Sequence, residues 1–230
     1  MWKANEAAAV GARGGMLLGS QATPACVILT RNGAVPFTTP SQLNQILSAV
    51  TAAGVGSLSP QLLHVCALDL IGKPGARGLA EYASGSSKPQ GRHDDAATGP
   101  GNADAESAGL ATFCGLSPHR VFLSTHNVAA WAYGTGTGAS DLATNASTNQ
   151  GHVKLTPNEY IDFVRAARPA VFDALSDPLP ANQLSKNRVR KSVDRTVAWL
   201  DAQIKLVADS QTATAPTSAA LHDGGEVCVQ

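Results

Sequence analysis

The fold class is decided by the stretch Val153-Lys154-Leu155-Thr156-Pro157-Asn158-Glu159-Tyr160-Ile161. Its first three residues are typical of a short strand, and Thr156-Pro157-Asn158-Glu159 is a capping box that opens a helix. Apolar residues then recur with helical spacing until a proline stops the helix: Tyr160, Ile161, Val164, Ala167 and Pro169. A strand that passes directly into a capped helix predicts an α/β unit.

The same arrangement occurs nearer the N-terminus. Residues 25–29 are a predicted strand, and Arg31-Asn32-Gly33 is a predicted turn, because an Asn-Gly pair tolerates positive φ. Thr39-Pro40-Ser41-Gln42 is a second capping box. The helix behind it carries one apolar face, made of Leu43, Ile46, Leu47 and Val50.

Further elements complete the pattern. Residues 170–175 form a short apolar run that predicts a buried strand, and 65–70 and 120–123 are additional strand candidates. Residues 187–208 predict a long helix, in which apolar residues recur at steps of three and four: Val189, Val193, Val197, Leu200, Ile204 and Val207. Strands that alternate with helices indicate a parallel sheet and α/β packing.

Two polar stretches interrupt this pattern. Residues 84–108 are rich in Gly, Ser, Asp and Ala, and residues 134–150 are rich in Gly, Thr, Ser and Asn. Neither carries enough apolar area to offset the entropy lost on ordering its backbone, so we predict disordered surface insertions. The prediction is one unit over 1–208 that contains both insertions, followed by a polar, irregular tail over 209–230.

Composition narrows the classes of function. The 17 Lys and Arg balance 17 Asp and Glu, and a formal net charge of zero argues against wholesale coating of nucleic acid, although a local basic face can still contact phosphates. The cysteines lie far apart and encode neither a compact zinc site nor a disulfide scaffold: Cys26, Cys66, Cys114 and Cys228. No secretory signal pattern or apolar run of membrane-spanning length is evident, so we expect a soluble intracellular protein.

Two segments resemble a known family. Thr23-Pro24 followed by Arg31-Asn32-Gly33-Ala34-Val35-Pro36-Phe37-Thr38-Thr39-Pro40 is similar to the opening strand, turn and helix of the tRNA-guanine transglycosylases. Arg188-Val189-Arg190-Lys191-Ser192-Val193-Asp194-Arg195-Thr196, followed by Trp199-Leu200-Asp201, resembles the long helix of one branch, the accessory subunit of eukaryotic queuine tRNA-ribosyltransferase. Residues 151–177, which end Phe172-Asp173-Ala174-Leu175-Ser176-Asp177, link these segments in the expected order.

The resemblance implies a fold and a function. The family fold is a (β/α)8 TIM barrel, so this chain would be the N-terminal half of such a barrel. Catalytic members exchange guanine in the tRNA anticodon loop for a deazaguanine base, with one carboxylate as the nucleophile and a second in an Asp-Ser-Gly-Gly-Phe-Gln segment. Resemblance to the accessory subunit implies a non-catalytic chain that supports guanine-to-queuine exchange as a heterodimer with the catalytic subunit, and that contacts tRNA.

The segment that matches Asp-Ser-Gly-Gly-Phe-Gln is Phe122-Leu123-Ser124-Thr125-His126-Asn127-Val128-Ala129. Thr125 occupies the family's carboxylate position, where a hydroxyl does not ionise usefully near neutral pH. Val128 replaces a glycine and crowds a loop that must admit a base. The resemblance therefore predicts no catalytic residue in this chain. An acid/base role for His126 is an alternative to a hydrogen-bonding role, which is favoured because no fixed carboxylate partner is evident nearby.

Two features remain as binding candidates. Asp177 lies just past a predicted strand, where catalytic relatives carry a base-reading carboxylate, and the alternative is a turn or cap residue before Pro178. Basic residues gather at the start of the long helix: Lys186, Arg188, Arg190, Lys191 and Arg195. They are candidates for contact with tRNA phosphates or with an acidic partner surface, and a solvated helix face is the alternative.

The resemblance also carries expectations about cofactor and location. The family's zinc ligands and nucleophilic carboxylate belong to the second half of the barrel, so they would lie beyond Gln230 and no metal ligand is predicted here. The accessory subunit implies a cytoplasmic location, with peripheral association at the mitochondrial outer membrane.

Two other interpretations compete with an accessory role. One is a divergent transglycosylase that uses Asp177 together with a displaced nucleophile such as Asp173 or Asp223. The other is a truncated fragment that does not fold stably, because half a barrel leaves open sheet edges and an uncovered apolar face.

Overall fold

A four-stranded parallel sheet forms the centre of the computed structural model, which describes residues 3–4, 15–17, 21–23, 26–53, 61–85, 109–126, 139–148, 151–179 and 185–213. Its strands follow the order β4-β5-β6-β9 and span Ile28–Leu29, Leu62–Cys66, Arg120–Ser124 and Val171–Phe172. Each neighbouring pair is parallel, and the order along the sheet is the order along the chain. The predicted α/β class with a parallel sheet is therefore confirmed.

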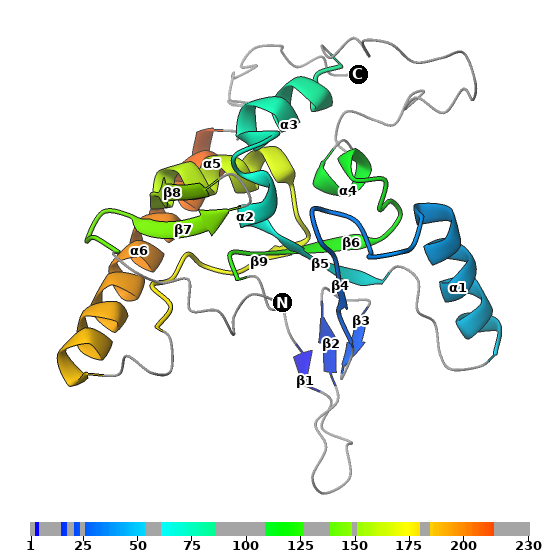
Figure 1. Ribbon diagram of the computed structural model, residues 1–230, viewed down its shortest axis with the longest axis horizontal. Coiled ribbons are helices and arrows are strands. Elements are labelled where there is room, and N and C mark those ends of the chain that lie inside the picture. Colours follow the sequence, from blue (N-terminus) through cyan, green and yellow to red (C-terminus); the bar gives the residue numbers. More distant parts are fainter. Residues whose placement is uncertain are drawn as a thin grey trace, which may run out of the picture.

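Five helices lie in the connections between these strands, and a sixth, α6, follows β9 in the described part of the chain. They are α1 (Pro40–Ala52), α2 (Ala67–Leu70), α3 (Gly75–Ala83), α4 (Leu110–Phe113), α5 (Pro157–Ala167) and α6 (Lys186–Ala213). Figure 1 shows α2, α3, α4 and α5 on one side of the sheet, with α1 and α6 at its two ends. None of the helices in the described ranges is long and apolar enough to cross a membrane.

Two smaller antiparallel sheets complete the fold. β1 (Lys3–Ala4), β2 (Gly15–Leu17) and β3 (Gln21–Thr23) form one, which lies on the side of the parallel sheet opposite the helices (Figure 1). β7 (Thr144–Thr148) and β8 (Gly151–Leu155) form a hairpin beside α5 and α6.

Alternating side chains along β5 and β6 divide the sheet into two faces. Leu63 and Val65 of β5 and Val121 and Leu123 of β6 belong to the main apolar core. That core also includes Tyr160, Phe163, Val164 and Ala167 of α5. The residues between them, including His64, Phe122 and Ser124, lie on the other face. Polar side chains near the carboxyl ends of the strands are thus kept out of the helix-covered core.

The local predictions for turns and caps are confirmed. Arg31 and Ala34 exchange backbone hydrogen bonds of 2.8 and 3.1 Å, and Asn32 and Gly33 between them have φ of 52° and 77°. Positive φ at both central positions is the turn that an Asn-Gly pair favours. Both capping boxes form, and in the second the Thr156 amide donates to Glu159 Oε2 at 2.9 Å.

Strand boundaries are less well predicted than helix starts. The predicted strand 25–29 is reduced to Ile28–Leu29, and 170–175 to Val171–Phe172. The candidate 65–70 is a strand only at Val65 and Cys66, where β5 ends, and is wrong for residues 67–70, which are helical. A strand ends where its partner ends, and that limit is set by tertiary pairing rather than by local apolar content.

The predicted insertions need correction where the structure describes them. Thr144–Thr148 lies in the predicted irregular stretch 134–150 but forms β7, because β8 supplies partners for its backbone through the hairpin. This also places the predicted strand at 153–155 in the hairpin and not in the parallel sheet. Residues 86–108 and 134–138 lie outside the described residues.

α6 departs from expectation in length and in orientation. It extends to Ala213, so the predicted irregular tail over 209–230 is wrong for its first five residues, and residues 214–230 lie outside the described part. Its predicted apolar face is largely exposed, with Val193, Val197 and Ile204 at 55%, 52% and 58%. The buried side chains are Ser192, Trp199 and Gln203.

Hydrogen bonds explain why the polar face of α6 is the buried one. Gln203 Oε1 accepts from the Leu175 amide at 3.1 Å, and Thr196 Oγ1 accepts from the Asp177 amide at 3.1 Å. Ser192 donates to the Asp177 carbonyl, and the Trp199 indole N–H donates to the Asp141 carbonyl at 2.9 Å. Among the described residues, no strand pairs with residues 175–177 after β9, so α6 satisfies their backbone groups. On α1, too, Ile46 belongs to the predicted apolar face but is exposed, so apolar spacing alone does not show which side chains are buried.

Thr156→Ala tests the contribution of the second capping box. We expect a loss of about 1 kcal/mol in the free energy of unfolding, because the Glu159 amide at the start of α5 loses its acceptor, the Thr156 hydroxyl. Urea denaturation followed by circular dichroism measures it. Thr156→Ser, which keeps the hydroxyl, is the matched control and should lose less than half as much; equal losses would contradict the capping explanation.

Candidate functional site

The site lies where β6 and β9 end. Ser124 is the last residue of β6 and is followed by Thr125 and His126, whereas Asp173 directly follows Phe172 of β9. The two strands are parallel neighbours, so their carboxyl ends meet at one edge of the sheet. In parallel α/β proteins this edge is where ligands and reacting groups gather.

The carboxylate of Asp173 is held by four different residues. Oδ2 accepts from Ser124 Oγ at 2.7 Å and lies 3.0 Å from His126 Nδ1. Oδ1 accepts from the Thr125 amide at 3.0 Å and from the Tyr160 hydroxyl at 3.2 Å. Donors from the end of β6 and from α5 thus fix the carboxylate at the end of β9 in one position.

These contacts favour the ionised carboxylate. Burial by itself would raise the pKa of Asp173, but hydrogen bonds from His126, Ser124 and the Thr125 amide outweigh it and lower the pKa below its usual value. The pKa of the Tyr160 hydroxyl is strongly raised, by burial first and then by the nearby charge of Asp173. Tyr160 is therefore a hydrogen-bond donor at this site and not an acid.

His126 connects Asp173 to a further hydroxyl. Its Nδ1 faces Asp173 and its Nε2 lies 3.1 Å from Ser176 Oγ. The sequence-based preference for a merely hydrogen-bonding histidine rested on the absence of a fixed carboxylate partner, and that premise is wrong. Asp173 is such a partner, 47 positions away along the chain.

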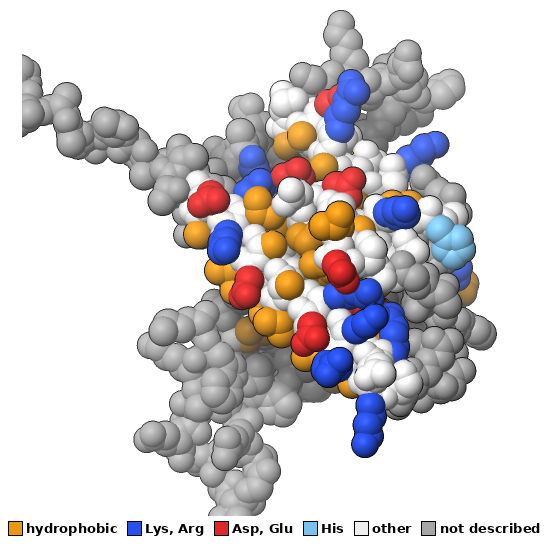
Figure 2. All heavy atoms as spheres, turned by 90° about the vertical axis from the view of Figure 1, so that its left-hand side faces the viewer, with side chains coloured by type: hydrophobic (Ala, Val, Ile, Leu, Met, Phe, Trp, Pro, Cys, Tyr) orange, Lys and Arg blue, Asp and Glu red, His pale blue; other side chains and the backbone are white. Residues whose placement is uncertain are grey.

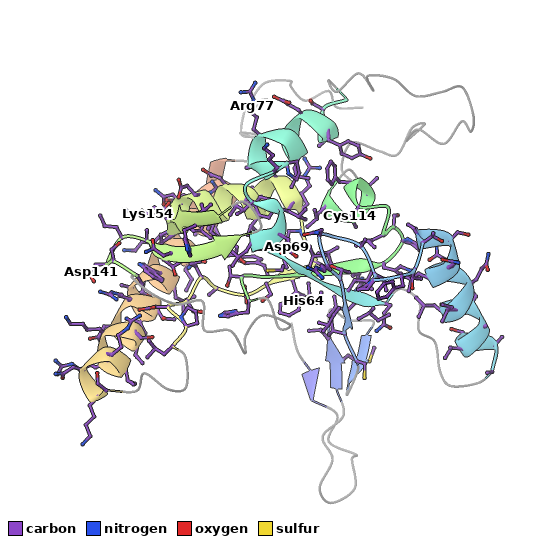
Figure 3. All side chains as sticks on the ribbon, in the orientation of Figure 1. His64, Asp69, Arg77, Cys114, Asp141 and Lys154 are labelled. Carbon is purple, nitrogen blue, oxygen red and sulfur yellow. The ribbon has the colours of Figure 1, made fainter. Side chains whose placement is uncertain are left out.

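A second histidine lies on the same face of the sheet. Figure 3 marks His64 on β5, whose strand is the neighbour of β6. Burial lowers the pKa of His64, and the charges of Asp173 and Asp69 partly oppose that effect. Among the described residues, His64 Nε2 is buried with no hydrogen-bond partner. This ring therefore adds an unsatisfied polar atom close to the site.

Asp177, the predicted base-reading residue, is engaged within the chain. Its side chain is 2% exposed, and Arg188 donates to both carboxylate oxygens at 2.7 and 2.9 Å. Arg195 adds a third contact of 3.3 Å to Oδ2. A bidentate guanidinium pair is the strongest geometry available to a carboxylate. Base recognition by Asp177 stays a prediction, and it would require these arginines to yield their hydrogen bonds.

The basic cluster is divided by this arrangement. Arg188 and Arg195 point inward to Asp177, and Arg195 also donates to Asp141 at 2.8 Å, near α6 in Figure 3. Lys186, Arg190 and Lys191 are exposed at the start of α6. Figure 2 shows the side of the molecule on which α6 lies, with Lys and Arg side chains gathered at one end of it, beside a band of hydrophobic side chains.

Thr125, at the predicted position of the lost carboxylate, is nearly buried. Its amide donates to Asp173, and its hydroxyl lies 3.4 Å from His126 Nδ1. A hydroxyl in this environment can donate or accept a hydrogen bond, but it does not supply a negative charge. The carboxylate beside Thr125 is that of Asp173, at the end of the neighbouring strand β9.

The described residues contain no cluster of potential metal ligands. In the ranges that the structure describes, no three His, Cys, Asp or Glu side chains are grouped so that they could hold a metal ion.

Comparison with known proteins adds to this geometry. A family model described as queuine tRNA-ribosyltransferase matches residues 98–224, a segment that contains the candidate site and α6. This chain belongs to the queuine tRNA-ribosyltransferase family. The family resemblance predicted from the motifs is thereby confirmed.

Three relatives share one name, queuine tRNA-ribosyltransferase accessory subunit 2. The protein from Trichoplax adhaerens is 29% identical over 186 residues, which cover 80% of this chain and 40% of the relative. The protein from Gallus gallus is 24% identical over 208 residues, covering 90% and 40%, and the one from Xenopus tropicalis is 31% identical over 108 residues, covering 43% and 24%. The chain thus spans at most 40% of the length of these relatives.

The sequence analysis named Thr125, His126 and Asp173 but did not bring them together, and it named Asp177, which the structure places in a separate set of contacts with α6. It missed Ser124 and Ser176, which both contact this cluster. One available signal was that polar residues follow two predicted strands, at 124–126 and at 173–177. The pairing of those strands was needed to turn that signal into a site.

Asp177→Asn tests whether the buried ion pair stabilises the fold. We expect a loss of about 3 kcal/mol in the free energy of unfolding, because Arg188 and Arg195 would lose a buried charged partner. Urea denaturation measures it. Asp162→Asn removes the exposed pair with Arg165 and should cost less than about 0.5 kcal/mol. Similar small losses for both variants would show that Asp177 is not structural.

Proposed function

We propose that this chain acts as a non-catalytic accessory subunit of queuine tRNA-ribosyltransferase, or as part of one, and supports guanine-to-queuine exchange in tRNA by pairing with the catalytic subunit. The observation that carries the proposal is the agreement of relatives that match 80% and 90% of the chain and are named accessory subunit 2. The family match over residues 98–224 supports it independently.

The chemistry of the strand ends supports a non-catalytic role in base exchange. Thr125 replaces the carboxylate that the resemblance places after β6, and its buried hydroxyl offers no charge for proton transfer. Asp177 is neutralised by two arginines. Position 125 thus lacks a carboxylate for proton transfer, and the Asp177 carboxylate is already paired with two arginines rather than free to bind a base.

The topology supports a barrel of the family type. Four parallel strands in chain order, each followed by helical segments, are what the first part of a (β/α)8 barrel requires. The family's zinc and a peripheral location at the mitochondrial outer membrane stay predictions from the resemblance.

The exposed face of α6 supports pairing with another protein surface. Val193, Val197, Leu200 and Ile204 form a stripe along one side of the helix, and each is at least 40% exposed. Figure 2 shows this hydrophobic band bordered by charged side chains. Contiguous apolar side chains within a charged rim are typical of protein-interaction surfaces.

Val197→Asp tests pairing through the α6 stripe. We expect at least a tenfold weaker affinity for a purified catalytic subunit, because a carboxylate would be desolvated in the apolar contact. Titration calorimetry measures the affinity. Ala198→Asp adds the same charge at the adjacent exposed position and should change it less than threefold. Equal effects of the two variants would exclude the stripe as the contact surface.

The same preparations test the proposed function as a whole. Guanine exchange into tRNA should require the catalytic subunit and should be stimulated by this chain. Exchange by this chain alone, lost in Asp177→Ala, would instead establish the divergent enzyme. If the folded chain neither binds the catalytic subunit nor stimulates exchange, the accessory role is rejected.

Lys186, Arg190 and Lys191 provide the proposed contact with tRNA phosphates. We expect the triple variant to alanine to weaken tRNA binding and to lower the slope of log affinity against log salt by one or more, about one for each phosphate that is no longer neutralised. Filter binding at several salt concentrations measures both. Lys205→Ala removes an exposed lysine elsewhere on α6 and should leave the slope unchanged; an equal effect would contradict a localised contact.

A further inference from the structure

Three side chains at the sheet edge form a continuous hydrogen-bonded series. Ser176 Oγ lies 3.1 Å from His126 Nε2, and His126 Nδ1 lies 3.0 Å from Asp173 Oδ2. Both ring nitrogens of His126 are therefore engaged, one by a hydroxyl and one by a carboxylate. The residues come from the ends of two neighbouring parallel strands, so the series is created by the fold.

The direction of the hydrogen bonds follows from the charge of Asp173. An ionised carboxylate only accepts hydrogen bonds, so His126 Nδ1 must carry the proton that it shares with Asp173. In the neutral imidazole, Nε2 then has a lone pair and accepts the hydroxyl proton of Ser176. A serine hydroxyl that donates to an oriented imidazole is the arrangement that activates serine as a nucleophile.

The carboxylate that orients His126 is held rigidly. Ser124, the Thr125 amide and Tyr160 all donate to Asp173, and Tyr160 is fully buried. The histidine and carboxylate side chains nonetheless keep 22% and 24% of their surface exposed, and Ser176 is half-buried. The series is thus fixed at one end and within reach of a small molecule at the other.

We propose that Ser176 is an activated nucleophile that accepts the acyl group of small carboxylic esters, with His126 as its general base and Asp173 as a positioning residue. Ser176 Oγ bonds to the ester carbonyl carbon while its proton passes to His126 Nε2. The bond to the leaving alkoxide breaks, and that oxygen takes the proton from His126. Water then attacks the acyl-serine carbonyl carbon and gives a proton to His126 Nε2. The bond from that carbon to Ser176 Oγ breaks, Oγ takes the proton from His126, and the carboxylic acid is released. This inference rests on contacts within the chain and does not depend on the accessory role.

An organofluorophosphate tests the proposal without tRNA or a partner protein. Diisopropyl fluorophosphate should form one adduct on the folded chain as Ser176 Oγ displaces fluoride, and peptide mass spectrometry should place it on Ser176. The adduct should be absent in Ser176→Ala. In His126→Gln and Asp173→Asn its rate should fall by about a hundredfold, because general-base assistance is lost or misdirected.

The controls separate an activated serine from a structural hydrogen bond. Ser124 also touches Asp173 but has no imidazole base, so it should stay unlabelled. Ser84→Ala, at the exposed end of α3, should leave labelling unchanged. Each variant is compared by thermal unfolding, and hydrolysis of p-nitrophenyl acetate should disappear on labelling in proportion to the adduct.

Two outcomes would overturn the proposal. One is no adduct on Ser176 in the folded wild-type chain. The other is labelling of Ser176 at the same rate in a folded His126→Gln variant, which would show that the histidine lends no reactivity. Should His126→Gln unfold, labelling of Ser176→Cys by iodoacetamide with and without His126→Asn decides the same question through thiol activation.

Discussion

The carboxylate of Asp173 joins the separate parts of this sheet edge. It accepts hydrogen bonds from Ser124 and the Thr125 amide at the end of β6, from His126 just beyond, and from Tyr160 on α5. Tyr160 also donates to the Asp173 carbonyl at 2.9 Å, which fixes the backbone of the same residue. β6, β9 and α5 are consequently held in one geometry by a single charged group whose low pKa results from the donors around it.

A second carboxylate plays the same part for α6. Asp177 binds Arg188 and Arg195, while Thr196, Ser192 and Gln203 satisfy the backbone of residues 175–177. Polar contacts thus attach α6 to the segment after β9, Trp199 anchors it in the apolar core, and its apolar stripe is left outward. This explains how a helix with a regular hydrophobic pattern can bury the opposite face, and why it presents a surface suited to another polypeptide.

The features predictable from the sequence are those determined within a few residues. The Asn32-Gly33 turn and both capping boxes depend on side chains that reach neighbouring amides, so the local sequence was sufficient. The buried face of α5 was also correct. For α6 the same spacing rule failed, because periodicity shows that residues share a face but not which surroundings that face meets. The site depended on the pairing of β6 with β9, which no local pattern specifies.

The threonine at position 125 also affects the charge of Asp173. Had an acidic side chain followed Ser124, it would have lain close to Asp173, and two adjacent carboxylates would have disfavoured their joint ionisation. With threonine there, the donors at the end of β6, including the N–H of His126 Nδ1, favour the ionised carboxylate of Asp173. The strand ends therefore carry an oriented imidazole that faces the Ser176 hydroxyl, in place of a pair of neighbouring acids. In the proposed reaction the proton that moves is that of the Ser176 hydroxyl. The Ser176 hydroxyl is therefore the reactive group at this edge, whereas the Asp173 carboxylate holds the strand ends together.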